Sequence, residues 1–444
     1  MTYARRDIDR FFVDWKGASS RKPLLLRGAR QVGKTSSVRE LGKRFSNFIE
    51  LNFLLDRRAK KIFERELLDP TEICKDISLL YEQQIVDGET LLFLDEIQEC
   101  PRAIEALRFF YELRPSLHVV AAGSLLEFAV SDIPSFGVGR VQSVYMRPLS
   151  FFEFLGALGK QTLRAAIEEA TFLKPLSAVA HDQALSQVKL YLMLGGLPEV
   201  VSALRSTRAD YQQSSAILTT LLANYEDDFS KYRGKVPDVR LRDCLRAVAY
   251  QTGKKFIYRH AYVDSVSTQV HHACALLEKA GLIVKVRHTA ANGVPLGAEI
   301  DEKKFKYKIF DLGIYQKLSG LSFRESVLEE TATFVHRGPL SEMFVGSELL
   351  CLAQSAEPGE LWYWHRESKS STAELDYVAE INHRVVPIEV KAGTKGSMRS
   401  LRIFLAEKKL PFGVRICAEN FSRYGDIYVV PLYATARLGA LLHS

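Results

Sequence analysis

Eight consecutive residues near the N-terminus have the types and spacing of a phosphate-binding loop. The motif G-x-x-x-x-G-K-[ST] is complete in Gly28, Ala29, Arg30, Gln31, Val32, Gly33, Lys34 and Thr35. In such a loop the glycines let backbone N–H groups surround a triphosphate at a helix N-terminus. Lys34 would meet the β- and γ-phosphates, and the hydroxyl of Thr35 would bind Mg²⁺. The motif therefore predicts a site for ATP or GTP with Mg²⁺.

Two carboxylates and a hydroxyl extend this candidate site. The apolar run 90–96 has the pattern of a buried parallel strand and ends in Asp95 and Glu96. Asp95 is predicted to hold Mg²⁺ through water, and Glu96 is predicted to be the general base for the attacking water. A second apolar run ends at Ser124, which is placed to sense the γ-phosphate or that water. Binding of ATP and its hydrolysis are the expected chemistry.

The surrounding elements must bring these residues together. An apolar run at 23–27 precedes the loop and a helical pattern follows it, which disfavours an ordinary glycine-rich turn. Strands alternating with helices predict a parallel sheet with helices on both faces, a P-loop NTPase domain over residues 1–150. Arg140 lies in the candidate mobile loop 137–140. It is either a finger that neutralises transition-state charge or a solvated loop arginine.

Length and composition set the limits of the interpretation. A chain of 444 residues with 47% hydrophobic content suggests two to four globular domains. No apolar run reaches 18 residues and no signal peptide is indicated, so we expect a cytoplasmic protein with no membrane span. The six cysteines form no C-x-x-C pair and are expected to be reduced thiols, not a zinc site. The net charge of +7 is modest.

The middle of the chain carries a weaker signal. Residues 151–235 read as mainly helical. Residues 236–320 combine two helical stretches with two strands, which is the order of a winged helix. Nine Lys or Arg fall within 231–260, and a basic strip on the second strand adds Lys303, Lys304, Lys306 and Lys308. This density suits contacts with the phosphates of DNA. A solvated face, or a winged helix used only for packing, is the alternative.

The last group of candidate residues lies near the C-terminus. Asp376 stands in an extended segment, and Ile388-Glu389-Val390-Lys391 follows twelve residues later. In a strand Glu389 and Lys391 share one face, and Asp376 would complete a carboxylate pair for Mg²⁺. This pattern resembles the D-x(n)-E-x-K signature of restriction-endonuclease-like, PD-(D/E)xK, nucleases. The resemblance implies a matching helix glutamate, Glu342. A same-face ion pair on an edge strand is the alternative.

Several strings together resemble one family. They are residues 27–35, 94–98, 122–124, 139–141, 148–155 and 191–199. They resemble prokaryotic AAA-type ATPases with a conserved C-terminal domain of unknown function. The resemblance implies ATP binding and hydrolysis, a doubly wound α/β core, a helical or winged-helix module, and a restriction-endonuclease-like α/β domain over 321–444. No family signature fixes Arg140 as the finger.

Three functions remain open at this point. The first is an ATP-driven switch or motor that moves its C-terminal module on DNA. The second is an ATP-gated, metal-dependent DNA nuclease that uses Glu342, Asp376, Glu389 and Lys391. The third is a signalling or scaffold ATPase whose C-terminal domains contact proteins. The sequence also leaves open whether the chain forms a homo-oligomer.

Overall fold

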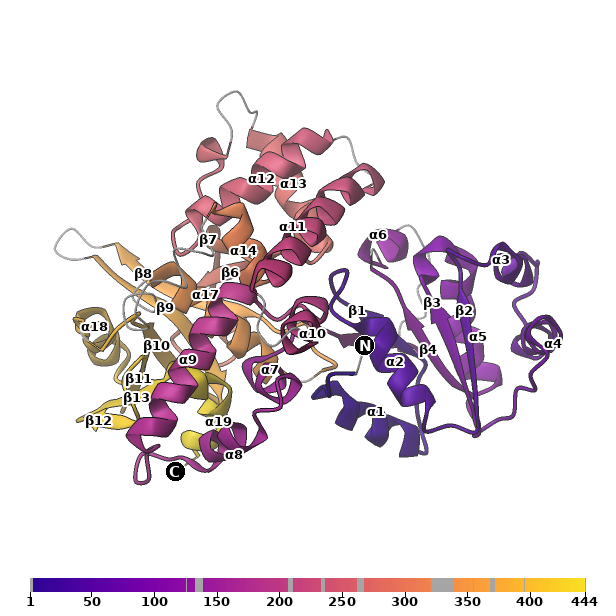
Figure 1. The fold of residues 1–444 in the computed structure, drawn as a ribbon. Coiled ribbons are helices and arrows are strands. Elements are labelled where there is room, and N and C mark those ends of the chain that lie inside the picture. Colours follow the sequence, from indigo (N-terminus) through magenta and orange to yellow (C-terminus); the bar gives the residue numbers. More distant parts are fainter. Residues whose placement is uncertain are drawn as a thin grey trace. The chain divides into compact units, whose positions relative to one another are not determined.

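The computed structural model describes residues 3–124, 126–131, 139–206, 211–232, 236–261, 267–320, 338–353, 355–367, 372–394 and 396–443. The chain divides into two units. The first comprises Met1–Arg147 with the short segments Lys279–Gly281 and Gln354–Pro358, and the second comprises the remainder. Each unit contains a β-sheet of its own, the first in indigo and purple in Figure 1.

Five parallel strands form the sheet of the first unit, in the order β2-β3-β4-β1-β5. Their bounds are β1 Leu24–Arg27, β2 Asn47–Asn52, β3 Thr90–Asp95, β4 His118–Ala122 and β5 Gln142–Tyr145. Asp95 pairs with Asn52 on one side and with Ala122 on the other. The carboxyl ends of β1, β3 and β4 therefore meet at one edge of the sheet, as the sequence predicts for a P-loop NTPase.

Helices cover both faces of this sheet (Figure 1). The bounds are α1 Ile8–Gly17, α2 Lys34–Gly42, α3 Arg57–Phe63, α4 Pro70–Tyr81, α5 Pro101–Leu113 and α6 Leu126–Ser131, with the 3₁₀ turn η1 Ile97–Glu99. The apolar sides of α3, α4 and α5 form one core with alternate strand residues such as Leu92 and Leu94. On the other face, His118 contacts Trp15 of α1 and Phe45 beyond α2.

The second unit begins with helices over 151–235, as predicted, and further helices follow up to residue 318. They are α7 Phe151–Ala157, α8 Gln161–Glu169, α9 Ala178–Leu194, α10 Pro198–Ser206, α11 Tyr211–Asp227, α12 Asp238–Gln251, α13 Ser267–Lys279 and α14 Leu312–Leu318, with 3₁₀ turns η2 Asp228–Lys231, η3 Tyr258–His260 and η4 Leu296–Glu299. Ser150 caps α7 through a reciprocal capping box with Glu153, since each side chain accepts from the other residue's backbone N–H.

The Gly-Gly turn between α9 and α10 is built around a buried carboxylate. Asp311 caps α14 by accepting from the backbone N–H of Ile314 at 3.1 Å, and it also accepts from Gly196 at 2.8 Å. Gly195 has φ 73°, and a Cβ there would lie 2.3 Å from Oδ1 of Asp311. Glycine is required here because the carboxylate approaches its backbone so closely. This part of the family-like string 191–199 therefore has a packing role.

An eight-stranded mixed sheet runs through the second unit in the order β12-β13-β11-β10-β9-β8-β6-β7. Its strands are β6 Ile283–Thr289, β7 Ile300–Ile309, β8 Leu361–Glu367, β9 Thr372–Ile381, β10 Arg384–Val390, β11 Gly413–Cys417, β12 Ser422–Tyr424 and β13 Ile427–Pro431. The helices α17 Gly338–Leu352, α18 Arg399–Lys408 and α19 Leu438–Leu441 and the 3₁₀ turn η5 Leu432–Arg437 complete the unit.

The predicted strands and helices of the middle region are present, but their sheet extends further than a two-stranded wing. Antiparallel β6 and β7 follow α12 and α13, and β6 also pairs in parallel with β8 at Val286 and Leu361. The hairpin is thus one end of the eight-stranded sheet. The four-domain division with boundaries at 150, 235 and 320 stays a prediction.

Candidate active site

The predicted phosphate loop connects β1 to α2. Gly28 has φ 139° and Gly33 has φ 98°, a region that favours glycine. A Cβ on Gly28 would lie 2.1 Å from the carbonyl oxygen of Met146, so this position has no room for a side chain. Arg6, which sequence reasoning missed, donates to the carbonyl of Val32 at 2.8 Å. The loop is thereby held at the N-terminus of α2, where backbone N–H groups lack helical partners.

Lys34, the seventh residue of the phosphate loop and the first residue of α2, is buried. Its ammonium donates to the carbonyl oxygens of Gly28 and Ala29, both at 2.8 Å. Burial lowers the pKa of Lys34 to about 8, although the nearby carboxylates of Glu96 and Asp95 favour its charged form. A buried ammonium held by loop carbonyls is a cation well placed for an anionic ligand.

Thr35 and Asp95 face each other across the carboxyl end of the sheet. Oγ1 of Thr35 lies 3.3 Å from both carboxylate oxygens of Asp95. Nδ2 of Asn52 donates to Oδ2 of Asp95 at 3.2 Å. Burial, with the charge of Glu96, raises the pKa of Asp95 to about 6. Hydroxyl and carboxylate oxygens are ligands that Mg²⁺ prefers, so the two residues predicted to bind the metal are brought together.

Glu96 follows β3 in a left-handed conformation, with φ 50°. Its Oε2 accepts a hydrogen bond from Nε2 of Gln98 at 2.5 Å. The other amide atom of Gln98, Oε1, is buried, and a Cβ on Gly123 would lie only 2.1 Å from it. The candidate base is thus held by a side chain that itself packs on the backbone following β4. Gln98 lies in the family-like string 94–98, but sequence reasoning gave it no role.

Ser124 stands two residues beyond Ala122, which pairs with both Asp95 and Leu26. Its hydroxyl is buried and has no hydrogen-bond partner within the described part of the chain. A buried polar group without a partner is unfavourable unless a ligand or water satisfies it. The unpaired hydroxyl and the buried Lys34 ammonium fit a bound nucleoside triphosphate.

Arg140 lies at the amino-terminal end of the parallel strands, whereas the phosphate loop lies at their carboxyl end. It precedes β5, whose first residue Gln142 pairs with Leu24 at the start of β1, whereas the phosphate loop follows the end of β1. Its guanidinium donates to Glu112 near the end of α5. A four-residue strand, about 13 Å long, separates the two edges. Within one copy of the chain, Arg140 and the phosphate loop are not brought together. Gly137 and Val138 of the predicted mobile loop lie outside the described residues.

The four predicted residues of the C-terminal cluster come from α17, β9 and β10 and the residue after it. Oδ2 of Asp376 accepts from the backbone N–H of Val390 at 2.7 Å, and Nζ of Lys391 donates to Oε1 of Glu389 at 2.5 Å. Burial and the charge of Asp376 raise the pKa of Glu389 to about 7. Burial also raises the pKa of Glu342 to about 7, opposed by the positive charge of Lys306.

Lys306 is the member of this cluster that sequence reasoning placed elsewhere. Its side chain is 2% exposed, and its ammonium lies 2.5 Å from Oε1 of Glu374 and 3.2 Å from Oε1 of Glu342. Oε2 of Glu389 is buried without a hydrogen-bond partner among the described residues. Within the same residues, no group of three or more His, Cys, Asp or Glu side chains is arranged to hold a metal ion.

Comparison with known families assigns the part of the chain that contains the first of these two sites. Residues 20–155 match a family model described as an AAA domain. The N-terminal part of the chain is an AAA-type ATPase. Residues 185–325 and 337–435 match two further models, each described as a domain of unknown function (DUF8612 and DUF4143). The ATPase thus carries C-terminal regions without an assigned function, and no curated protein matches its sequence.

Solved structures similar in fold to parts of the ATPase include the following three. The Walker-type ATPase PABY2304 of Pyrococcus abyssi has 15% identity and a TM-score of 0.46, over 71% of this chain and 96% of that chain. Aeropyrum pernix ORC1, solved in complex with DNA, has 13% identity and a TM-score of 0.29, over 74% and 95%. Caenorhabditis elegans PCH-2 has 15% identity and a TM-score of 0.22, over 45% and 54%. The family model and the site geometry carry the identification.

The basic strip predicted on β7 is only partly at the surface, which corrects that prediction. Lys306 and Lys308 are each 2% exposed, because β7 is covered on both faces from Phe305 to Ile309. Lys308 donates to Oγ of Ser347 at 2.7 Å. Lys304 lies 3.7 Å from Asp301, and Lys303 remains exposed. Two of the four lysines therefore face acidic or hydroxyl groups of the protein and are not available to DNA phosphates.

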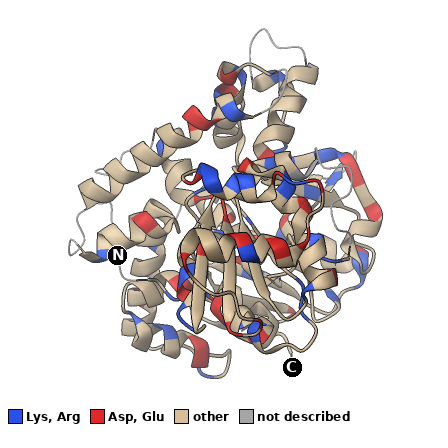
Figure 2. Cartoon of the chain, turned by 90° about the vertical axis from the view of Figure 1, so that its right-hand side faces the viewer, with Lys and Arg blue, Asp and Glu red and all other residues tan. Residues whose placement is uncertain are grey.

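Three basic side chains of the stretch 231–260 are paired with carboxylates that precede this stretch. Arg242 and Arg246 each lie 3.7 Å from Glu226, and Lys231 lies 2.7 Å from Asp228. Arg233 and Lys235 lie outside the described residues. Exposed basic side chains remain at Lys254, Lys255 and Arg259. In the view of Figure 2, segments of Lys and Arg are interspersed with segments of Asp and Glu.

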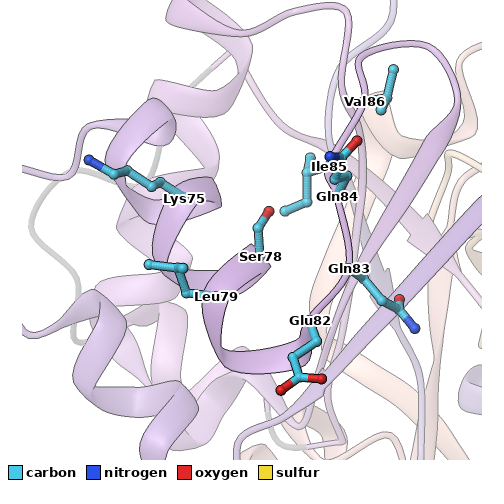
Figure 3. Close-up of a pocket in the computed structure, with 8 residues that line it drawn as sticks. All are labelled: Lys75, Ser78, Leu79, Glu82, Gln83, Gln84, Ile85 and Val86. Atoms are coloured by element: carbon cyan, nitrogen blue, oxygen red, sulfur yellow. The ribbon is translucent and has the colours of Figure 1, made fainter.

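An open surface depression of about 440 Å³ lies beside α4 (Figure 3). It is lined by Lys75, Ser78, Leu79, Glu82, Gln83, Gln84, Ile85 and Val86. None of the residues predicted to bind nucleotide or metal lines it.

None of the helices in the described part of the chain combines the length and the apolar character that crossing a bilayer requires.

Proposed function

We propose that the ATPase binds ATP with Mg²⁺ at the phosphate loop and that Glu96 is the base that activates water. The observation that carries the proposal is the convergence of Lys34, Thr35, Asp95 and Glu96 at one edge of the sheet. Oγ1 of Thr35 lies 3.3 Å from the carboxylate of Asp95, and the ammonium of Lys34 is buried beside them.

Each of these side chains has a distinct role in the proposal. Lys34 exchanges its loop carbonyls for phosphate oxygens, which carry more negative charge. Thr35 and Asp95 hold Mg²⁺, directly or through water, while Asn52 fixes the Asp95 carboxylate. When bound, Mg²⁺ neutralises the charge that develops on the phosphates. Glu96 accepts the proton of the attacking water, and Ser124 orients that water or the γ-phosphate.

We assign Arg140 to a second copy of the chain. Its place at the opposite edge of the sheet keeps it from the phosphate loop of its own copy, so a finger role requires a neighbour. In that role Arg140 exchanges its ion pair with Glu112 for the phosphates bound by the adjacent copy. The proposal therefore includes a homo-oligomer as the active form.

Coupling of the nucleotide state to DNA is the finer part of the proposal. The observation that favours it is the group of exposed basic side chains at Lys254, Lys255 and Arg259, in a segment whose residue Lys255 pairs with Lys306 of β7. They have no acidic partner among the described residues. Phosphate contacts of this kind bind DNA without sequence preference and weaken with salt.

The test is ATP turnover by the full chain with Mg²⁺, alone and with double- or single-stranded DNA. In Glu96→Gln the size is kept and the proton acceptor is lost, so ATP should still bind while turnover falls about 10²-fold or more. In Lys34→Ala both binding and turnover should collapse. Normal turnover in Lys34→Ala would contradict the nucleotide site itself, and normal turnover in Glu96→Gln would contradict only the assigned base.

A further inference from the structure

The carboxylate cluster of the second unit already contains a cation. The ammonium of Lys306 lies 2.5 Å from Glu374 and 3.2 Å from Glu342, and 5.0 Å from the ring centre of Tyr363. Burial alone would lower the pKa of Lys306, but the negative charges of Glu342 and Glu374 outweigh it and the net shift is upward. A lysine this deeply buried is stable as a cation because its acidic partners surround it.

The position of this ammonium differs from that of an ordinary surface ion pair. Lys306 reaches the cluster from β7, whereas its partners come from α17 and β9. Asp376, two residues from Glu374 on the same strand, adds a further negative charge that favours the charged form of Lys306. Three carboxylates thus act on one ammonium. Oxygen donors gathered from separate elements around one centre are what a hard divalent cation uses.

A second observation is that the carboxylates of the cluster outnumber its ammonium groups. Glu389 is 5% exposed, its Oε1 accepts from Lys391, and its Oε2 has no hydrogen-bond partner within the described residues. The cluster therefore holds four carboxylates, Glu342, Glu374, Asp376 and Glu389, against two ammonium groups, Lys306 and Lys391. The buried guanidinium of Arg415 is a further positive charge beside it, since Arg415 pairs in register with Glu389 on the next strand. Loss of the Lys306 ammonium would therefore leave buried carboxylates that only another cation could balance.

We propose that Lys306 takes the place of a divalent cation in this cluster, so that the native chain does not bind Mg²⁺ or Mn²⁺ there. Removal of the ammonium would free Glu342, Glu374 and Asp376 as ligands and turn the cluster into a divalent-cation site. The proposal does not depend on the role of the phosphate loop. It makes this region a site that its own ammonium closes to metal, and it disfavours metal-dependent cleavage of DNA by the native protein.

The test uses Mn²⁺ alone as the probe, without nucleotide, on the full chain. All variants carry Asp95→Asn, which removes a candidate ligand at the phosphate loop. The chain with Asp95→Asn alone is the parent. Bound Mn²⁺ is measured from the loss of the free-ion electron paramagnetic resonance signal. Lys306→Ser should bind one additional Mn²⁺, at least about 10-fold more tightly than its parent, because the net charge of the cluster falls by one. Adding Asp376→Asn should abolish that gain.

Lys308→Ser is the matched control. Lys308 is equally buried on the same face of β7, but it donates to the hydroxyl of Ser347. It should show no gain in Mn²⁺ binding. A folded Lys306→Ser that gains no Mn²⁺, or a Lys308→Ser that gains as much, overturns the proposal.

The parent protein provides a test that does not require Lys306→Ser to fold. If the cluster is closed, the parent and its Asp376→Asn variant should bind Mn²⁺ equally weakly. Binding by the parent that is lost in Asp376→Asn would show an open metal site and overturn the proposal. Failure of ATP hydrolysis would not affect either readout, so the two proposals can fail separately.

Discussion

Gln98 holds Glu96 through a hydrogen bond of 2.5 Å between Nε2 and Oε2. The two residues are two positions apart, and Glu96 reaches this geometry in a left-handed backbone conformation. The amide of Gln98 is fixed in turn against the backbone at Gly123. The orientation of the candidate base therefore depends on a neutral side chain that takes no part in the chemistry.

Gln98→Met should lower kcat for ATP about 10-fold while the affinity for ATP changes little, since the base would lose its orientation and not its charge. Steady-state turnover together with ATP titration separates the two effects. Glu99→Gln is the control, because Glu99 points to Lys60 at 3.4 Å and not to Glu96. An unchanged kcat in Gln98→Met would mean that this hydrogen bond does not position the base.

Arg140→Ala should reduce ATP turnover by about 10²-fold or more if Arg140 completes the site of a neighbouring copy. Lys34→Ala should be inactive on its own as well. A mixture of the two should regain activity, because an intact phosphate loop from one variant would meet an intact Arg140 from the other. Turnover of each variant and of the mixture is measured at equal total protein.

Glu112→Gln is the control for the arginine. It removes the ion-pair partner of Arg140 within the same copy and should leave turnover close to that of the native chain. If Arg140→Ala hydrolyses ATP normally, Arg140 is not an arginine finger. If the mixture regains nothing while Arg140→Ala is inactive, a role between copies is excluded.

Lys254→Ala with Lys255→Ala should weaken binding of a labelled DNA duplex about 10-fold at low salt and reduce the slope of log affinity against log salt by about 2. Lys174→Ala with Lys409→Ala removes two other exposed lysines and is the matched control. Equal losses in both double variants would reflect net charge alone. No loss in the first would place any DNA contact elsewhere.

His118 should make the ATPase less stable in mild acid. Burial lowers its pKa from 6.5 to about 4, and its Nδ1 has no hydrogen-bond partner among the described residues. Because the folded pKa is depressed, the unfolded chain binds the proton more readily, so this stability is present above pH 6.5 and is lost as the pH falls through about 4.

The melting temperature between pH 7.5 and 4 measures this effect. His118→Gln should show a smaller fall than the native chain, whereas His383→Gln should behave like the native chain because His383 is 96% exposed. Identical pH profiles for the native chain and His118→Gln would show that His118 does not control acid stability.

The nucleotide site was predictable because its parts lie next to strand ends that the sequence marks clearly. Lys34 and Thr35 follow one apolar run, and Asp95 and Glu96 end another, so a parallel sheet had to bring them to one edge. Asn52 and Gln98 were not predicted. Their roles depend on strand order and on a single left-handed residue, neither of which a local pattern specifies.

The lysines of β7 show the opposite limit. Alternation correctly predicts that Lys306 and Lys308 share a face. The pattern does not say that both faces of the strand are covered, and lysines are normally solvated. The partners that stabilise Lys306 inside the protein, Glu342 and Glu374, are 36 and 68 residues away in sequence. A short-range pattern could not have identified them.

The pairing of β6 with β8 has a practical consequence for dissecting the chain. The two strands come from the two regions of unknown function, and their backbones share one hydrogen-bonded ladder. A polypeptide that stopped at Gly320, or one that started at Gly338, would carry a strand with a row of unpaired N–H and C=O groups along one side. Such edges recruit other chains. The two halves should therefore stay in solution when they are produced together and precipitate when they are produced apart.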